Sequence, residues 1–89
     1  MVIHKNLRIT GRVQGVGYRY SALQAALQCG VKGYVRNMPD GSVYVEAEGN
    51  EDELELFIRW CNEGPPRAKV IAVSAITGVV KSFEEFQVK

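Results

Sequence analysis

The residue types best suited to chemistry lie together in one short segment, residues 11–19, with the sequence GRVQGVGYR. Its glycines allow the backbone to adopt positive φ angles and to turn several amide groups toward one point. A helical pattern follows, and the first N–H groups of a helix lack intrahelical partners and lie at the positive end of the helix dipole. The segment therefore predicts an anion-binding turn.

A basic residue stands where this first helix begins, and its charge opposes the helix dipole. Arg19 occupies that position, and no acidic residue precedes Asp40. The second predicted helix begins in the opposite way, with Asn50 as a cap and acidic residues at positions 51–53, as the dipole favours. The contrast indicates that a ligand supplies the negative charge that is missing beside Arg19.

Charge is unevenly distributed along the chain, although the formal net charge is only +1. The first 39 residues carry six basic and no acidic side chains, whereas the rest carries five basic and ten acidic ones. A basic half is compatible with nucleic acid as a partner. These charges are spread over two strands and a helix without a dense patch, so a small anionic ligand fits them at least as well.

Composition is that of a soluble globular protein, and the length predicts a single domain over residues 1–89. No apolar run approaches the roughly 18 residues of a membrane-spanning helix. Residues 1–5 lack the long apolar centre of a signal peptide. We therefore expect a cytoplasmic location, and we expect a monomer that contacts neither membranes nor nucleic acids.

Metal-dependent and thiol-based chemistry have few candidate residues. Cys29 and Cys61 are the only cysteines, they lack a CxxC spacing, and His4 is the only histidine. A zinc site would have too few ligands, and a Cys/His or Ser/His pair would depend on His4, for which we expect no chemical role. The sequence thus predicts no metal and no cofactor.

The elements that position the glycine segment can be predicted from periodicity and turn residues. Alternating apolar residues favour strands, apolar residues three and four apart favour helices, and Gly, Pro and Asp mark turns. The predicted elements are strand 3–13, helix 20–29 ending at Gly30, strand 31–37, strand 43–47, a helix following Asn50, strand 70–80 and a short strand within 83–88. On the first helix we expect one apolar face of Tyr20, Ala22, Leu23, Ala26 and Leu27.

This order of elements predicts an α+β fold, the ferredoxin-like βαββαβ sandwich, with an antiparallel sheet and two helices on one face. The plan returns strand 31–37 to the end of the sheet where the glycine segment lies. Asn37 then becomes a neighbour of Arg19. Backbone amides and an arginine can bind a phosphate, and a carboxamide can hold a water molecule by donating and accepting together.

Two segments, GRVQGVGYR (11–19) and GYVRNMPDGSVYVEAEG (33–49), resemble the two signature motifs of the acylphosphatase family. The second matches throughout, at Gly33, Tyr34, Val35, Arg36, Asn37, Gly41, Val43 and Gly49. Two independent motifs at the right separation are far more specific than one glycine pattern. One departure is Ala22, where family members often carry Ser or Thr.

The resemblance implies hydrolysis of the carboxyl-phosphate bond of small acyl phosphates, giving a carboxylate and inorganic phosphate. It implies that Arg19 and Asn37 are catalytic, with the Arg19 guanidinium holding the phosphate and Asn37 orienting the attacking water. The implied phosphate-binding amides are those of Gln14, Gly15, Val16, Gly17, Tyr18 and Arg19. No metal or cofactor is implied, and inorganic phosphate or sulfate is expected to compete for the site.

Two alternatives remain open at this point. One is a catalytically silent module that binds phosphate or carbamoyl phosphate inside a larger assembly. The other is an RNA-binding ferredoxin-like domain, because RNA-recognition domains share this element order. Such domains stack bases on aromatic residues of adjacent central strands. Here Tyr34 is only a faint match, and the first strand offers no exposed aromatic residue.

Overall fold

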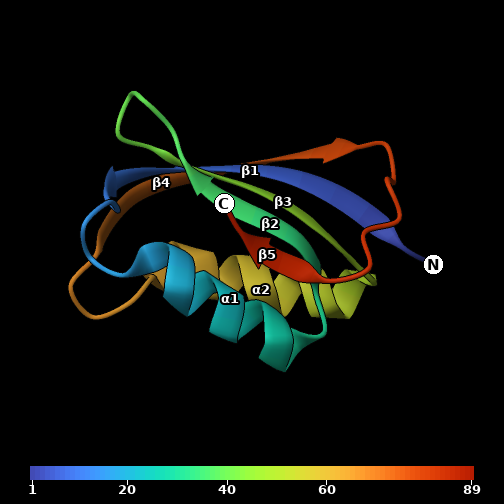
Figure 1. Ribbon diagram of the computed structural model, residues 1–89. Helices are drawn as coiled ribbons and strands as arrows, with labels where there is room; N and C mark the ends of the chain where they lie inside the picture. The colour runs from blue at the N-terminus through green and yellow to red at the C-terminus, as the bar shows by residue number, and fades with distance from the viewer.

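The computed structural model describes residues 1–89 as a five-stranded sheet with two helices on one face (Figure 1). The elements are β1 (Ile3–Arg12), α1 (Tyr18–Cys29), β2 (Lys32–Asn37), β3 (Val43–Gly49), α2 (Glu51–Glu63), β4 (Lys69–Gly78) and β5 (Phe86–Val88). The ferredoxin-like order predicted from the sequence is confirmed. No helix is long and apolar enough to span a membrane.

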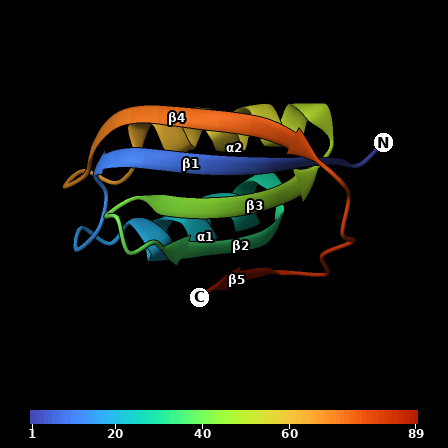
Figure 2. The same cartoon turned by 90° about the horizontal axis from the view of Figure 1, so that it is seen from above.

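The strands lie side by side in the order β4-β1-β3-β2-β5 (Figure 2). The pairs β1–β3, β1–β4 and β2–β3 are antiparallel, whereas β5 pairs with β2 in parallel. The sheet is therefore mixed rather than purely antiparallel. The cause is the segment 79–85, which leaves β4 and crosses to the far edge, so that β5 runs in the direction of β2. The final strand is shorter than the predicted range 83–88.

Helix α1 begins at Tyr18, two residues earlier than the sequence pattern predicts. Its buried residues are Tyr18, Ala22, Ala25 and Ala26. The Tyr18 hydroxyl donates a hydrogen bond to the Cys61 carbonyl oxygen at 2.8 Å, which fixes the start of α1 against α2. Small alanines then allow α1 to pack closely on the core.

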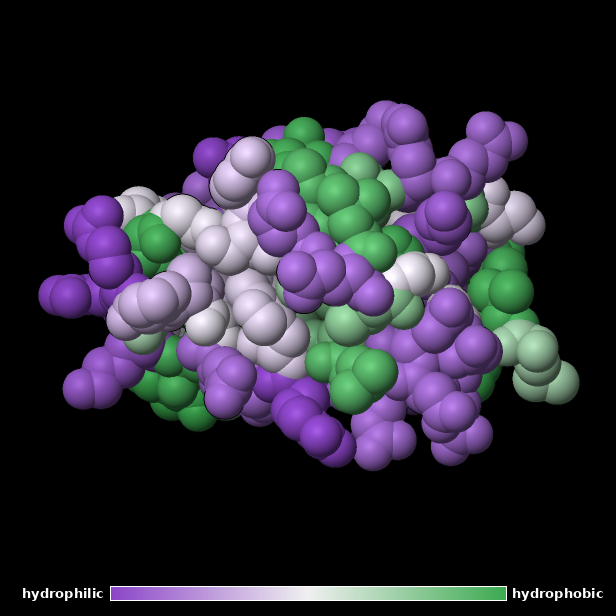
Figure 3. All heavy atoms as spheres, turned by 90° about the horizontal axis from the view of Figure 1, so that it is seen from below, coloured by the Kyte–Doolittle hydropathy of each residue, from purple (hydrophilic) through white to green (hydrophobic).

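The predicted apolar face of α1 was partly wrong. Tyr20 is 67% exposed and Leu27 is 63% exposed. Both lie on the side of α1 opposite the buried alanines, so these large side chains point outward while the small ones face the sheet. On this helix side, hydrophobic residues form separate patches among hydrophilic ones (Figure 3).

The start of α2 has the cap that the sequence predicts. The Asn50 side chain accepts a hydrogen bond from the Glu53 amide, and the Glu53 carboxylate accepts one from the Asn50 amide, both at 2.8 Å. This capping box stabilises the first turn.

Both cysteines, Cys29 and Cys61, are free thiols. Burial raises the pKa of the Cys61 thiol to about 12.

The outer face of the sheet holds a buried polar cluster that the sequence did not indicate. His4 is 1% exposed, and its Nδ1 lies 2.7 Å from the Glu48 carboxylate. Glu48 also accepts hydrogen bonds from the amides of Lys81 and Phe83, at the crossing segment. Glu48 therefore attaches the segment that carries the chain toward β5.

Replacing Glu48 by glutamine is expected to lower the free energy of unfolding by about 3 kcal/mol, because the change breaks a buried charged interaction. Burial alone would raise the pKa of Glu48, but hydrogen bonds from Lys81, His4 and Phe83 outweigh it and hold the pKa below its usual 4.5. The stabilisation is thus present above pH 4.5 and is lost as the pH falls through the lower folded-state value.

Urea unfolding at neutral pH and in acid, below the folded-state pKa, tests this expectation. The stability difference between wild type and Glu48→Gln is expected to be large at neutral pH and to shrink in acid. The control is Glu55→Gln, because the Glu55 side chain is 66% exposed and pairs only with Arg59. Equal effects of the two substitutions would contradict the anchoring role of Glu48.

Candidate active site

The glycine segment forms the connection from β1 to α1, at the end of the sheet where β2 also ends (Figures 1 and 2). Gly15 and Gly17 have φ angles of +74° and +80°, in the left-handed region that favours glycine. Gly17 is the N-cap of α1, and no side chain caps the helix there. The first turn of α1 contains no acidic residue. This end of α1 therefore keeps its positive potential.

The amides of residues 14–19 have no acceptor within the protein. None of the backbone hydrogen bonds made outside the strands and helices is donated by one of these residues. The amides that donate to side chains all belong to other parts of the chain. Tyr18 and Arg19 begin α1, where amides have no intrahelical partner. Six consecutive donors are therefore available to a ligand, a cluster expected of an anion site.

A cavity of about 180 Å³, called the loop cavity here, lies against this segment. Its lining residues are Val13, Gly15, Gly17, Tyr18, Arg19, Tyr20, Asn37 and Val88. The structure thus brings together Arg19, Asn37 and four of the six predicted amide residues. The other two, Gln14 and Val16, line a neighbouring cavity. Val88 was not predicted, because its position depends on the parallel pairing of β5.

Arg19 is half-buried and has no Asp or Glu side chain as a partner. Its Nη1 donates a hydrogen bond to the Lys89 carbonyl oxygen at 2.7 Å. The Lys89 amide in turn donates to the Val35 carbonyl oxygen at 2.8 Å, at the end of the β2–β5 pairing. The contact orients the guanidinium, and no Asp or Glu side chain forms an ion pair with it. The sequence did not indicate this contact, because it joins residues 70 positions apart.

Asn37 contains the one buried side-chain polar atom of the structure without a hydrogen-bond partner, its Oδ1. A buried acceptor left unpaired costs about 1–3 kcal/mol. Such groups are normally paired with protein or with ordered water, so this one requires an explanation. A donor bound in the loop cavity, such as a water molecule, would satisfy it.

Gln14 connects the glycine segment to the β2–β3 hairpin, a role that the sequence did not reveal. Its Nε2 donates to the carbonyl oxygens of Met38 and Ser42, at 2.8 and 2.9 Å. Asp40 fixes the same turn by accepting from the Ser42 hydroxyl and amide, and these bonds lower the pKa of Asp40. The loop and Asn37 are thereby held in one geometry.

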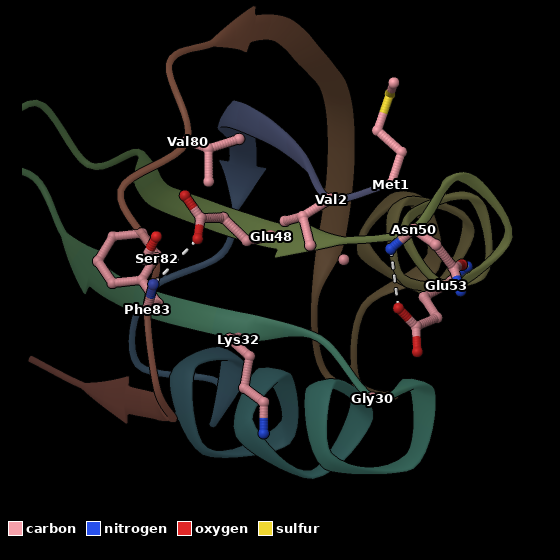
Figure 4. A pocket seen from close by; sticks show the side chains of 11 residues that line it. Met1, Val2, Gly30, Lys32, Glu48, Asn50, Glu53, Val80, Ser82 and Phe83 are labelled. Carbon is pink, nitrogen blue, oxygen red and sulfur yellow. Dashed lines mark hydrogen bonds between the residues drawn. The ribbon is translucent and has the colours of Figure 1, made fainter.

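Another cavity lies at the opposite end of the sheet and measures about 510 Å³ (Figure 4). Its two acidic side chains already accept hydrogen bonds. Glu53 accepts from the Asn50 amide, and Glu48 accepts from the Phe83 amide. No group of three His, Cys, Asp or Glu side chains in the structure could hold a metal ion.

Comparison with known proteins identifies the family. A sequence model described as acylphosphatase matches residues 5–88. An acylphosphatase of Trichormus variabilis is 44% identical over 88 residues, which is 99% of this chain and 87% of that protein. One of Thermotoga petrophila is 46% identical over 83 residues, 93% of this chain and 92% of the relative.

Comparison of the fold with solved structures identifies the same family. The crystal structure of acylphosphatase from Bacillus subtilis matches with a TM-score of 0.95 and 32% identity, over 100% of this chain and 99% of that one. Sequence and fold therefore agree over nearly the full length of both proteins. The chain belongs to the acylphosphatase family.

Proposed function

We propose that this enzyme hydrolyses small acyl phosphates at the loop cavity, with Arg19 and the amides of residues 14–19 holding the phosphoryl group and Asn37 orienting the attacking water. Membership of the acylphosphatase family supports the reaction itself. The assignment to residues rests on one observation, the six unpaired amides that adjoin Arg19, which has no Asp or Glu partner. Their electrostatics are unbalanced until an anion binds.

The attacking water is assigned to Asn37 because its Oδ1 is buried, unpaired and on the wall of the same cavity. In the reaction the water oxygen forms a bond to phosphorus, while the bond between phosphorus and the acyl oxygen breaks. The carboxylate leaves with that electron pair. A phosphoryl oxygen of the substrate takes the proton from the water, so no side chain has to act as a base.

Positioning and charge stabilisation account for most of the catalysis in phosphoryl transfer. The arginine and the amides are fixed before the substrate binds, because Lys89 orients Arg19 and Gln14 fixes the loop. Such preorganised donors lose little free energy to rearrangement during the reaction. A carboxylate is also a good leaving group, so this limited set of groups is sufficient.

Hydrolysis of benzoyl phosphate, measured with a chelator present and no added metal, tests the proposal. We expect turnover with hyperbolic kinetics, and we expect inorganic phosphate and sulfate to inhibit competitively because they occupy the same amides. Full dependence on an added divalent metal would contradict the proposed mechanism. Phosphate binding without turnover would instead indicate the catalytically silent module.

A further inference from the structure

A second cavity adjoins the loop cavity and contains two arginines. It measures about 560 Å³ and is lined by Arg12, Gln14, Gly15, Val16, Pro66 and Arg67. We call it the arginine cavity. Gly15 lines both cavities, and a Cβ placed there would meet no protein atom within 4 Å. No side chain at position 15 therefore separates the two spaces.

The charge of the arginine cavity is not compensated by the protein. Arg12 and Arg67 are exposed, and neither takes part in any salt bridge of the structure. Lys69 is the cross-strand partner of Arg12 on β4 and adds a further positive charge nearby. Glu63, at the end of α2, pairs with neither arginine. The cavity is thus suited to an anionic group.

The in-line geometry of phosphoryl transfer indicates which part of the substrate lies near the arginine cavity. In phosphoryl transfer the attacking and leaving oxygens lie roughly in line through phosphorus. If Asn37 holds the water, the acyl group lies on the side of the phosphoryl group away from Asn37. The arginine cavity shares Gln14, Gly15 and Val16 with the proposed phosphate-binding segment and has neither Asn37 nor Arg19 in its wall. Its wall is therefore available to the acyl part.

We propose that Arg12 and Arg67 determine substrate specificity by favouring acyl phosphates whose acyl part carries a second negative charge. This inference rests on the proposed function, and it names the substrate class of that same site. A carboxylate on the acyl group would enter the arginine cavity while the phosphoryl group binds the amides. Arginine is well suited to the task, because its planar guanidinium binds carboxylates through two parallel hydrogen bonds.

The test compares substrates that differ only in the charge of the acyl part. Benzoyl phosphate measures the basic reaction, 3- and 4-carboxybenzoyl phosphate carry the extra charge, and the matching carbamoylbenzoyl phosphates are neutral and of similar size. These rigid compounds cannot cyclise. The quantity measured is the ratio of kcat/KM between the carboxy and the carbamoyl substrate. Intrinsic reactivity cancels when this ratio is compared between wild type and variant.

Wild type is expected to prefer at least one carboxy substrate. Arg12→Gln and Arg67→Gln are each expected to lower the ratio about two- to fivefold, the range for one exposed ion pair, and the double variant more. Added salt should reduce the preference, because exposed charges are screened. The control is Arg59→Gln, which removes an exposed arginine from α2 and should leave the ratio unchanged.

The outcomes separate the two proposals. Wild type, Arg12→Gln and Arg67→Gln could all hydrolyse benzoyl phosphate and share one ratio of kcat/KM between the carboxy and the carbamoyl substrate. That result would overturn the specificity inference and leave the proposed function intact. A fall of the ratio in Arg59→Gln as large as in the other two would also overturn it, because only net charge would then matter. Failure of wild type to hydrolyse benzoyl phosphate would overturn both.

Discussion

Replacing Arg19 by glutamine is expected to lower kcat/KM for benzoyl phosphate about 100- to 1,000-fold, the loss caused by removing one preorganised donor to a transition-state oxygen. The inhibition constant of inorganic phosphate should rise about 10- to 100-fold, since a hydrogen bond to a charged group contributes roughly 1.5–3 kcal/mol. Both effects have one cause, because Arg19 is the only cation on the wall of the loop cavity.

Arg19→Lys separates charge from geometry in this prediction. Lysine keeps the positive charge but cannot form two parallel hydrogen bonds with a phosphoryl group. Lysine also has fewer N–H donors than arginine. It therefore cannot bind the Lys89 main-chain oxygen and the ligand in the same fixed arrangement. We expect phosphate binding to recover partly and kcat to recover much less.

Steady-state kinetics and calorimetric titration with inorganic phosphate provide the measurements. Arg36→Gln serves as a control, because Arg36 is an exposed arginine of β2 that does not line the loop cavity. An unchanged dissociation constant for phosphate in Arg19→Gln would contradict the assignment of the anion site to this residue.

Local features made most of the fold predictable from sequence. The glycine segment, the Gly30 helix end and the cap at Asn50 each depend on residues close together in the chain. Such positions restrict the backbone regardless of the rest of the molecule.

The missed features all depend on contacts between distant parts of the chain. The outward position of Tyr20 follows from the anchoring of Tyr18 on Cys61, 43 residues away. The parallel pairing of β5 depends on the position of the crossing segment 79–85. Glu48 fixes that position by accepting hydrogen bonds from the Lys81 and Phe83 amides on the outer face of the sheet. Apolar periodicity carries no information on these contacts, because they involve single polar groups and not a repeating pattern.

In the candidate site, too, the sequence predicts the main residues but not the long-range contacts that position them. The sequence predicts that Arg19 and Asn37 are neighbours, and both line the loop cavity. The groups that position them, the Gln14 side chain and the Lys89 carbonyl, could not be inferred. A backbone carbonyl is present at every residue, so its use as a positioning group leaves no trace in residue type. The catalytic roles of Arg19 and Asn37 stay predictions until tested.

Replacing Asn37 by alanine is expected to have a different kinetic signature from the Arg19 variants. Turnover of benzoyl phosphate should fall about 100- to 1,000-fold in kcat, as for loss of one preorganised polar group. The inhibition constant of inorganic phosphate should change little, because the amides of residues 14–19 and Arg19 remain. Asn62→Ala is the control, since Asn62 is an exposed asparagine of α2 outside the cavity.

Stability gives a second and independent readout for Asn37. Most substitutions of partly buried residues destabilise a protein by removing contacts. Alanine here removes an oxygen that accepts no hydrogen bond from the protein, so no hydrogen bond within the protein is lost and the free energy of unfolding should change little. A residue retained for folding would behave in the opposite way. A lower kcat with an undiminished free energy of unfolding in Asn37→Ala would therefore identify Asn37 as a group that holds the reacting water. Full activity or clear destabilisation of this variant would contradict that role.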